Sequence, residues 1–176
     1  MSNKTIRRPL FTWFPVTAGG VFYASAVGVA ALMPQAGCAP PLLVTAMALF
    51  FWALGWNSTV RITPTHVSIT NVVVTTTVAW RDVEQVTMDD GIGIHLRDGH
   101  EIGSIAFGGS LIGVFTRYPS HRRAYRLLQD AHRGAGRGRR PRRAGDVELQ
   151  HSVDWRRLLV AAAVLYTPLL IVFAIG

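Results

Sequence analysis

Three long runs without a charged side chain dominate the hydropathy pattern of this 176-residue chain. They cover residues 10–33, 39–56 and 158–176. Each approaches the roughly 20 residues that a helix needs to cross about 30 Å of hydrocarbon. One such run alone fits a buried core helix, but three leave too few residues to surround them. The pattern therefore predicts three transmembrane helices.

Between the second and third runs, the pattern changes to short segments that alternate apolar and polar positions or are rich in β-branched residues. These segments are residues 59–63, 66–70, 74–80, 84–88, 92–96 and 101–107. The pair Asp98-Gly99 separates the last two, which predicts a hairpin with a type I′ turn. The spacing indicates five or six antiparallel strands.

Helical spacing follows the last strand. Ala124, Leu127, Leu128 and Ala131 recur at intervals that place them on one face of a helix. Ser120 is a suitable N-cap and Gly134 a suitable stop. This amphipathic helix is expected to cover the open end of the small sheet.

These elements define a membrane protein of the α+β class, with three transmembrane helices and a small antiparallel sheet or barrel followed by a helix. The expected parts are a cytoplasmic tail (1–9), a helical hairpin (10–56) with an outside loop (34–40), a β domain (57–133), a flexible arginine-rich linker (134–154) and a third helix (155–176).

The charge distribution orients these helices. The formal net charge is +8, and three basic residues precede the first helix (Lys4, Arg7 and Arg8). The loop 34–40 has no charge, and the other 15 basic residues lie between the second and third runs. Basic flanks stay in the cytoplasm, so the N-terminus and the β domain face inward and the C-terminus faces out. Tryptophan, which favours the headgroup zone, stands at each cytoplasmic helix end: Trp13, Trp56 and Trp155.

The sequence GRGRRPRRAG (136–145) carries five arginines and no acidic residue. Without aromatic residues for base stacking, it does not favour nucleic acid. It fits a disordered linker that reinforces the membrane topology. It also fits a segment that binds anionic lipid, where each basic residue contributes about 1 kcal/mol to binding. An acidic protein partner stays open as a third interpretation. The candidate lipid contacts are Arg137, Arg139, Arg140, Arg142, Arg143, Arg156 and Arg157.

A short motif inside the β region resembles a known family. WRDVEQV (80–86) and LRDG (96–99) are similar to the W-x-D-V-x-x-V and L-x-D-G pattern of bacterial PH-like domains. Within these, the chain resembles the actinobacterial family named for a mycobacterial low-molecular-weight protein antigen, over about residues 40–133; the third helix and the linker lie outside. The resemblance implies a PH-like fold after two membrane helices, used for binding or scaffolding, with no catalytic residues and no inherited lipid specificity.

The search for catalytic chemistry is negative. The chain has no phosphate-binding loop, no CxxC and no GxSxG. His100-Glu101 begins an HExxH-like string, but position 104 is Ser and the stretch reads as a strand. Asp89-Asp90-Gly91 fits a β-turn better than a cation site. We expect no enzyme, no cofactor and no metal.

The apolar runs contain no Asp, Glu, Lys, Arg or His, which disfavours ion or proton transport. Gly20, Ala24 and Gly28 form a stripe of small residues suited to close helix contact. The interpretation favoured by the sequence is packing within this chain's own helices, although a homo-oligomer stays open.

Two functions follow as hypotheses for a bacterial plasma membrane protein. The first is a non-enzymatic scaffold or accessory subunit whose PH-like domain recruits a protein partner. The second is a module that responds to anionic lipid through the domain and the juxtamembrane arginines. The candidate partner surface, which a solvated helix face also explains, is Arg122, Arg123, Arg126 and Arg133.

Cys38, the single cysteine, tests the orientation. A lipoprotein signal ending at Cys38 is disfavoured, because the preceding apolar run exceeds the usual signal core of about 7–15 residues and position 35 is Gln. With the loop 34–40 outside, a membrane-impermeant maleimide should label Cys38 in intact cells. Labelling only after lysis contradicts this orientation.

Overall fold

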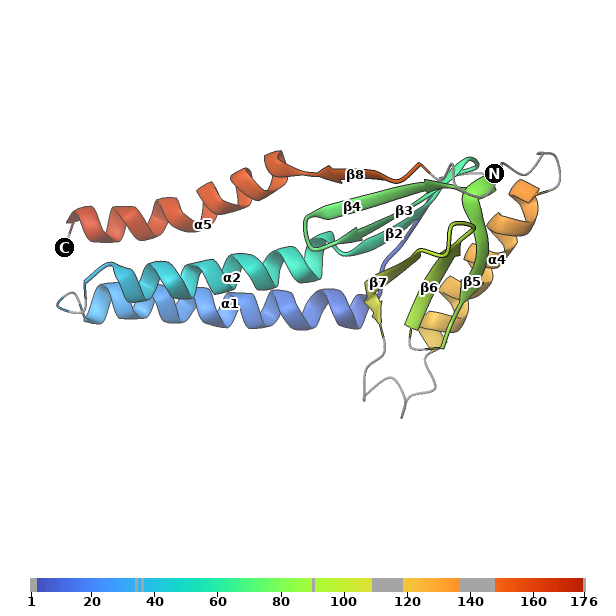
Figure 1. Ribbon diagram of the computed structural model, residues 1–176. Coiled ribbons are helices and arrows are strands. Elements are labelled where there is room, and N and C mark those ends of the chain that lie inside the picture. The colour runs from blue at the N-terminus through green and yellow to red at the C-terminus, as the bar shows by residue number, and fades with distance from the viewer. Residues whose placement is uncertain are drawn as a thin grey trace. The chain divides into compact units, whose positions relative to one another are not determined.

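The computed structural model describes residues 3–33, 35, 37–89, 91–108, 119–136 and 148–175 (Figure 1). The chain is an α+β protein that divides into two compact units. The helical unit consists of Pro9–Asn57 and Asp154–Gly176, and the β unit consists of Met1–Arg8 and Ser58–Val153. Each unit is therefore assembled from segments that lie far apart in the sequence.

Three helices of the helical unit are long and apolar enough to cross a membrane. They are α1 (Pro9–Leu32), α2 (Ala39–Asn57) and α5 (Trp155–Ile175). The predicted apolar helices are confirmed at this level. α5 begins before its apolar run because Asp154 caps it: the Asp154 carboxylate accepts a hydrogen bond from the Arg157 backbone N–H at 3.2 Å.

Glycine allows α1 and α2 to approach closely. A Cβ built on Gly55 of α2 would lie 2.7 Å from the Thr12 carbonyl oxygen of α1, and one on Gly19 of α1 would lie 3.0 Å from the Ala48 carbonyl oxygen. Beside the Gly19 contact, Phe22 and Phe51 stack with ring centroids 5.3 Å apart. The backbones of the two helices are thus in direct contact.

The small-residue stripe predicted for this contact is not the one used. Gly20 and Ala24 are exposed, and no atom lies within 4 Å of a Cβ built on Gly20 or Gly28 among the atoms compared. The interpretation that Gly20, Ala24 and Gly28 pack inside this chain's own helices is therefore wrong for the described residues. Helical spacing shows which small residues share a face, but not which face meets the neighbouring helix.

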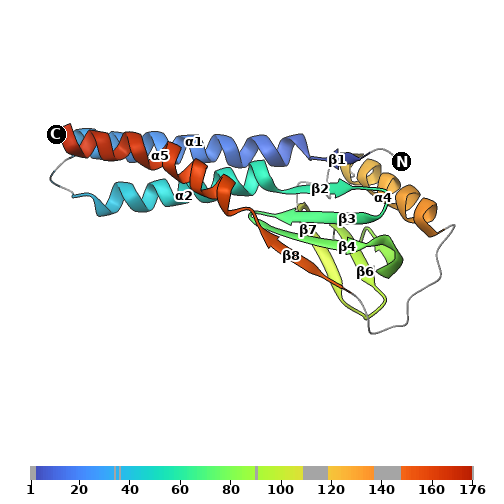
Figure 2. The same cartoon turned by 90° about the horizontal axis from the view of Figure 1, so that it is seen from above.

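The β unit contains two antiparallel sheets, of five strands in the order β1-β2-β3-β4-β8 and of three in the order β5-β6-β7 (Figure 2). Each predicted strand is present with bounds shifted by a few residues at most. The bounds are β1 Lys4–Ile6, β2 Thr59–Ile62, β3 His66–Asn71, β4 Val74–Ala79, β5 Val83–Thr87, β6 Gly91–Leu96, β7 Glu101–Gly108 and β8 Gln150–Val153. One 3-10 turn, η2 (Trp80–Asp82), leads from the first sheet to the second.

Two edge strands extend this sheet beyond the predicted domain boundaries of 57–133. β1 lies in the segment expected to be a tail and pairs antiparallel with β2, and β8 lies in the segment expected to be a flexible linker and pairs with β4. Both strands are short, and all but their last residue is exposed. They therefore carry no apolar alternation from which they might be predicted.

Asn71, the last residue of β3, joins the two sheets. Its amide nitrogen donates a hydrogen bond to the Gly103 carbonyl at 2.8 Å, and its amide oxygen accepts one from the Ile105 N–H at 2.9 Å. The side chain thus pairs with the outer edge of β7 in the way a further strand would. The buried apolar side chains of the β unit include Ile69, Trp80, Ile92, Ile94, Leu96 and Phe107.

The β6–β7 hairpin differs from its predicted turn. A type I′ turn needs positive φ at both Asp98 and Gly99, but only Gly99 (φ 87°) has it. The Gly99 N–H donates to the Leu96 carbonyl at 3.0 Å, and the Leu96 N–H donates to the His100 carbonyl at 2.8 Å. This is a three-residue loop that ends in a left-handed glycine.

Helix α4 (Pro119–Gly136) packs on the β unit through one face. Ala124, Leu128 and Ala131 are buried as predicted, whereas Leu127 is only half-buried. The helix continues two residues past Gly134, which was expected to end it. In the first turn His121 is buried, and its ring lies edge-on to Phe107 at 5.5 Å between centroids.

Gly55→Ala should destabilise the protein by about 1–3 kcal/mol, because the new methyl group overlaps the α1 backbone. Gly20→Ala is the matched control, since it gains the same helix propensity in open space. Thermal unfolding in detergent, followed by circular dichroism, measures the difference. Equal melting temperatures of the two variants would contradict the close α1–α2 contact.

The docking of α4 should weaken in acid. Burial, and secondarily the charge of Arg8, lower the pKa of His121 below its ordinary 6.5; hydrogen bonds with the backbone of Gly108 and Phe107 act in the opposite direction. The unfolded chain then takes up the proton first, so stability falls as the pH drops below 6.5 toward the lowered folded pKa. Melting temperatures measured from pH 8 to 5 should fall less in His121→Phe than in the wild type or in the exposed control His66→Gln.

Candidate functional site

The seven arginines predicted to contact lipid fall into two groups. Arg137, Arg139, Arg140, Arg142 and Arg143, the linker arginines, lie outside the described residues. Arg156 and Arg157 lie in the first turn of α5 and line one cavity. The geometry of a site can therefore be built from the second group.

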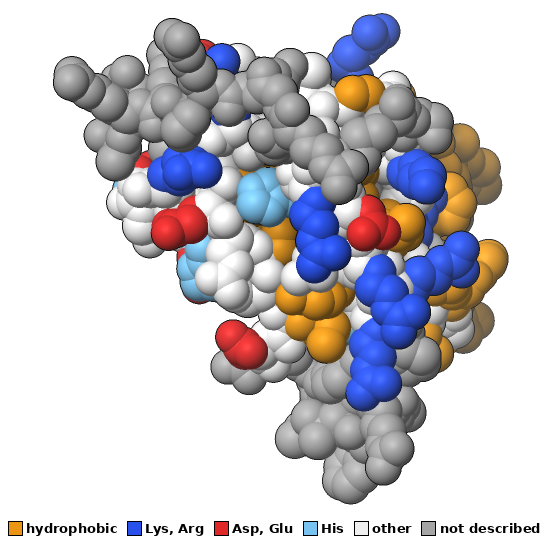
Figure 3. Space-filling model, turned by 90° about the vertical axis from the view of Figure 1, so that its right-hand side faces the viewer, with side chains coloured by type: hydrophobic (Ala, Val, Ile, Leu, Met, Phe, Trp, Pro, Cys, Tyr) orange, Lys and Arg blue, Asp and Glu red, His pale blue; other side chains and the backbone are white. Residues whose placement is uncertain are grey.

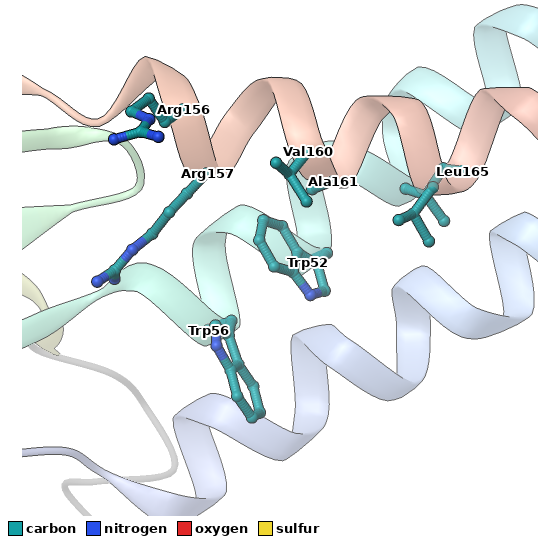
Figure 4. A pocket seen from close by; sticks show the side chains of 8 residues that line it. Trp52, Trp56, Arg156, Arg157, Val160, Ala161 and Leu165 are labelled. Carbon is teal, nitrogen blue, oxygen red and sulfur yellow. The ribbon is translucent and has the colours of Figure 1, made fainter.

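This cavity is a groove of about 460 Å³ between α2 and α5, which we call the interhelical groove (Figure 4). From α2 come Trp52 and Trp56, one helical turn apart and so on the same face. From α5 come residues three, four, seven and eight positions after Arg157, which again share a face. The complete lining is Trp52, Trp56, Arg156, Arg157, Val160, Ala161, Val164 and Leu165.

The walls of the groove are apolar. The Trp52 indole points from α2 toward Val160 and Ala161 of α5 (Figure 4). Val160 and Val164 are each 65% exposed, so the helix packing leaves most of their surface uncovered. An uncovered apolar wall of this kind gains free energy, about 25 cal/mol per Å², when hydrocarbon covers it.

Positive charge is concentrated at one end of the groove. The Arg157 guanidinium pairs with the Asp154 carboxylate, with 2.9 Å between Nε and Oδ2, which offsets part of its charge. In the part of the chain that the structure describes, no acidic side chain pairs with Arg156. The groove thus presents at least one uncompensated guanidinium, a planar donor suited to phosphate and carboxylate.

Together these features suit an amphiphile with an anionic head. The apolar walls accept a hydrocarbon chain, and the arginines meet the negatively charged group at its end. The volume falls within the range of about 300–1,000 Å³ typical of small-molecule sites. Trp52 was missed in the sequence analysis, although its four-residue spacing from Trp56 was the available signal.

The candidate partner surface on α4 is a separate feature. Arg122, Arg123, Arg126 and Arg133 are all exposed. They lie away from the buried positions Ala124, Leu128 and Ala131 of the same helix. On the side of the molecule drawn in Figure 3, basic side chains gather beside exposed apolar ones. Exposure alone fits a solvated helix face equally well.

The described residues contain no group of three or more His, Cys, Asp and Glu side chains that could hold a metal ion. Glu101 begins strand β7, so the HExxH-like string does not form a helix. Asp90 of the Asp89-Asp90-Gly91 sequence lies outside the described residues.

Comparison with known proteins adds no family to this description. No protein-family model matches the chain, and no curated protein or solved structure compared with it matches either.

Proposed function

We propose that this protein is a non-enzymatic, multi-pass bacterial plasma membrane protein that binds anionic lipid in the interhelical groove and carries a PH-like β unit in the cytoplasm. The observation that carries the proposal is the apolar groove with arginine at one end. The same chemistry extends to the linker arginines, which belong to the same anionic-lipid hypothesis.

Exposed apolar side chains support membrane insertion. Trp13 is 64% and Phe14 73% exposed on α1, and the other two long helices also leave large apolar residues uncovered. In water, such faces would form one apolar patch far larger than a soluble monomer tolerates. In a bilayer they face hydrocarbon, which also explains the absence of charged residues along α1 and α2.

The pairing of β1 with β2 supports the proposed orientation. Thr5 pairs with Arg61 across the two strands, so the segments before α1 and after α2 belong to one sheet. Two membrane-spanning helices, α1 and α2, return the chain to the side of the membrane on which it started. This return is needed for β1 and β2 to pair. The excess of basic residues in both segments favours the cytoplasmic side.

The arrangement of the β unit supports a PH-like fold. Seven strands in two antiparallel sheets, β1–β4 and β5–β7, precede one amphipathic helix that packs on them. β8 is an addition at the edge of β4. The hypothesis of a scaffold that recruits a protein partner has the exposed α4 arginines as its single support, so the lipid function is the one we argue.

Native mass spectrometry of the detergent-purified full chain tests the lipid function. Titrated phosphatidylglycerol should bind more tightly than phosphatidylcholine, and the double variant Arg156→Gln, Arg157→Gln should lose about tenfold in affinity for the anionic lipid, because two basic residues contribute up to about 2 kcal/mol and Asp154 offsets part of it. Trp52→Ala should weaken the binding of both lipids to the same extent, since it removes part of the apolar wall of the groove.

The matched control is Arg122→Gln, Arg123→Gln, which removes the same charge from α4. If this control and the groove variant bind phosphatidylglycerol equally, the groove is not the lipid site. A variant with the five linker arginines replaced by Gln separates their contribution from that of the groove.

A further inference from the structure

A second cavity, of about 470 Å³, lies in the β unit at the β6–β7 hairpin. The register of these two strands is irregular beside the cavity. Gly91 pairs with Gly108 and Gly93 with Gly103, so one residue of β6 stands opposite four of β7 between these pairs. We call this cavity the hairpin pocket.

Asn71 binds the strand that forms one side of the pocket. Its side chain binds the backbone of Gly103 and Ile105, the part of β7 where the pairing with β6 breaks. The β7 backbone therefore has hydrogen-bond partners on β3 where its pairing with β6 is irregular. The pocket is lined by residues of β5, β6 and β7, together with Asp89 of the connection between β5 and β6.

The absence of a side chain at Gly93 leaves space in the pocket. A Cβ built on Gly93 would overlap the Glu101 carboxylate and lie 2.8 Å from the Thr87 hydroxyl oxygen. These two polar groups therefore converge over the position where any other residue would place its side chain.

The polar side chains of the pocket are two carboxylates, two hydroxyls and one imidazole. His95 Nε2 lies 3.2 Å from the Thr87 hydroxyl and 3.8 Å from a Glu101 carboxylate oxygen. Asp89 adds a second carboxylate to the lining, and the lining contains no Lys or Arg. Ser104, also in the lining, is 3% exposed, and its buried hydroxyl has no hydrogen-bond partner in the described structure. A buried hydroxyl without a partner is costly unless a bound group satisfies it.

The lining holds two carboxylates against one histidine, His95, and this excess of acidic groups favours a cation. In the part of the chain that the structure describes, no group of three or more His, Cys, Asp and Glu side chains could hold a metal ion, and the acceptors of this lining include hydroxyl oxygens as well as carboxylates. A group that spreads several N–H donors over a larger volume fits them better. Ile92 and Ile105 provide apolar lining for an alkyl chain behind that group.

We propose that the hairpin pocket binds an organic cation, an alkyl guanidinium or alkyl ammonium group, with Glu101 and Asp89 as its charge partners. The chemistry is that of an arginine or lysine side chain and equally that of a free alkylamine. The site is independent of the interhelical groove, which has the opposite charge preference.

Isothermal titration calorimetry on the full chain in detergent tests this, with n-butylguanidinium as probe and the neutral, nearly isosteric n-butylurea as its control. The cation should bind at least tenfold more tightly than the urea. Glu101→Gln should reduce this preference severalfold, since only the Asp89 carboxylate remains; the Glu101 side chain is 55% exposed, so the substitution is compatible with folding. Equal binding of the two probes, or no binding of the cation at millimolar concentration, overturns the proposal.

Two further variants locate the site. Glu84→Gln removes an exposed carboxylate of β5 outside the pocket and should leave the affinity unchanged. Gly93→Ala keeps every charge but displaces the Glu101 carboxylate, and should weaken binding severalfold. Undiminished binding to Glu101→Gln, or an equal loss in Glu84→Gln, also overturns the assignment.

A capped Gly-Arg-Gly peptide then distinguishes the sources of the cation. Binding as tight as that of n-butylguanidinium indicates a basic side chain of a protein. Exclusion of the peptide, with the small cation still bound, indicates a free alkylamine.

Discussion

The antiparallel pairing of β1 with β2 is the constraint on which the architecture depends. Lys4 pairs with Ile62 and Ile6 with Val60, so everything between these strands must leave the sheet and return to it. α1 and α2 meet this requirement as a hairpin whose backbones touch at Gly19 and Gly55. The chain passes between its two units at Arg8-Pro9, Asn57-Ser58 and Val153-Asp154.

Both candidate sites lie where the packing of neighbouring elements leaves a cavity. In the helical unit, α5 leaves an apolar wall uncovered beside α2, with arginine in its first turn. In the β unit, the pairing of β7 with β6 is irregular beside the residues that Asn71 binds. The first cavity combines hydrocarbon surface with positive charge, and the second combines carboxylates with glycine-cleared space. Their opposite charges make them suited to different ligands on one chain.

Much of the fold could be predicted from local pattern. The apolar runs predict α1, α2 and α5, because a charged residue inside such a helix is so unfavourable that its absence is informative. The alternation in β2–β4 predicts strands because one face is buried, as Val67 and Ile69 show. The same logic fails for β1 and β8, whose exposed side chains leave no alternation to detect. Arg156 and Arg157 were predicted as lipid contacts, but the groove that contains them was not.

The sequence by itself determined which segments form apolar helices, which form the principal strands and where the basic residues concentrate, because period, length and charge are local properties. Only the tertiary structure decided which glycines lie at the α1–α2 contact. It also decided that β1 pairs with β2 at the edge of the sheet and that Trp52 lines a groove with α5. Those outcomes depend on the relative placement of segments up to about a hundred residues apart, for which local periodicity carries no information.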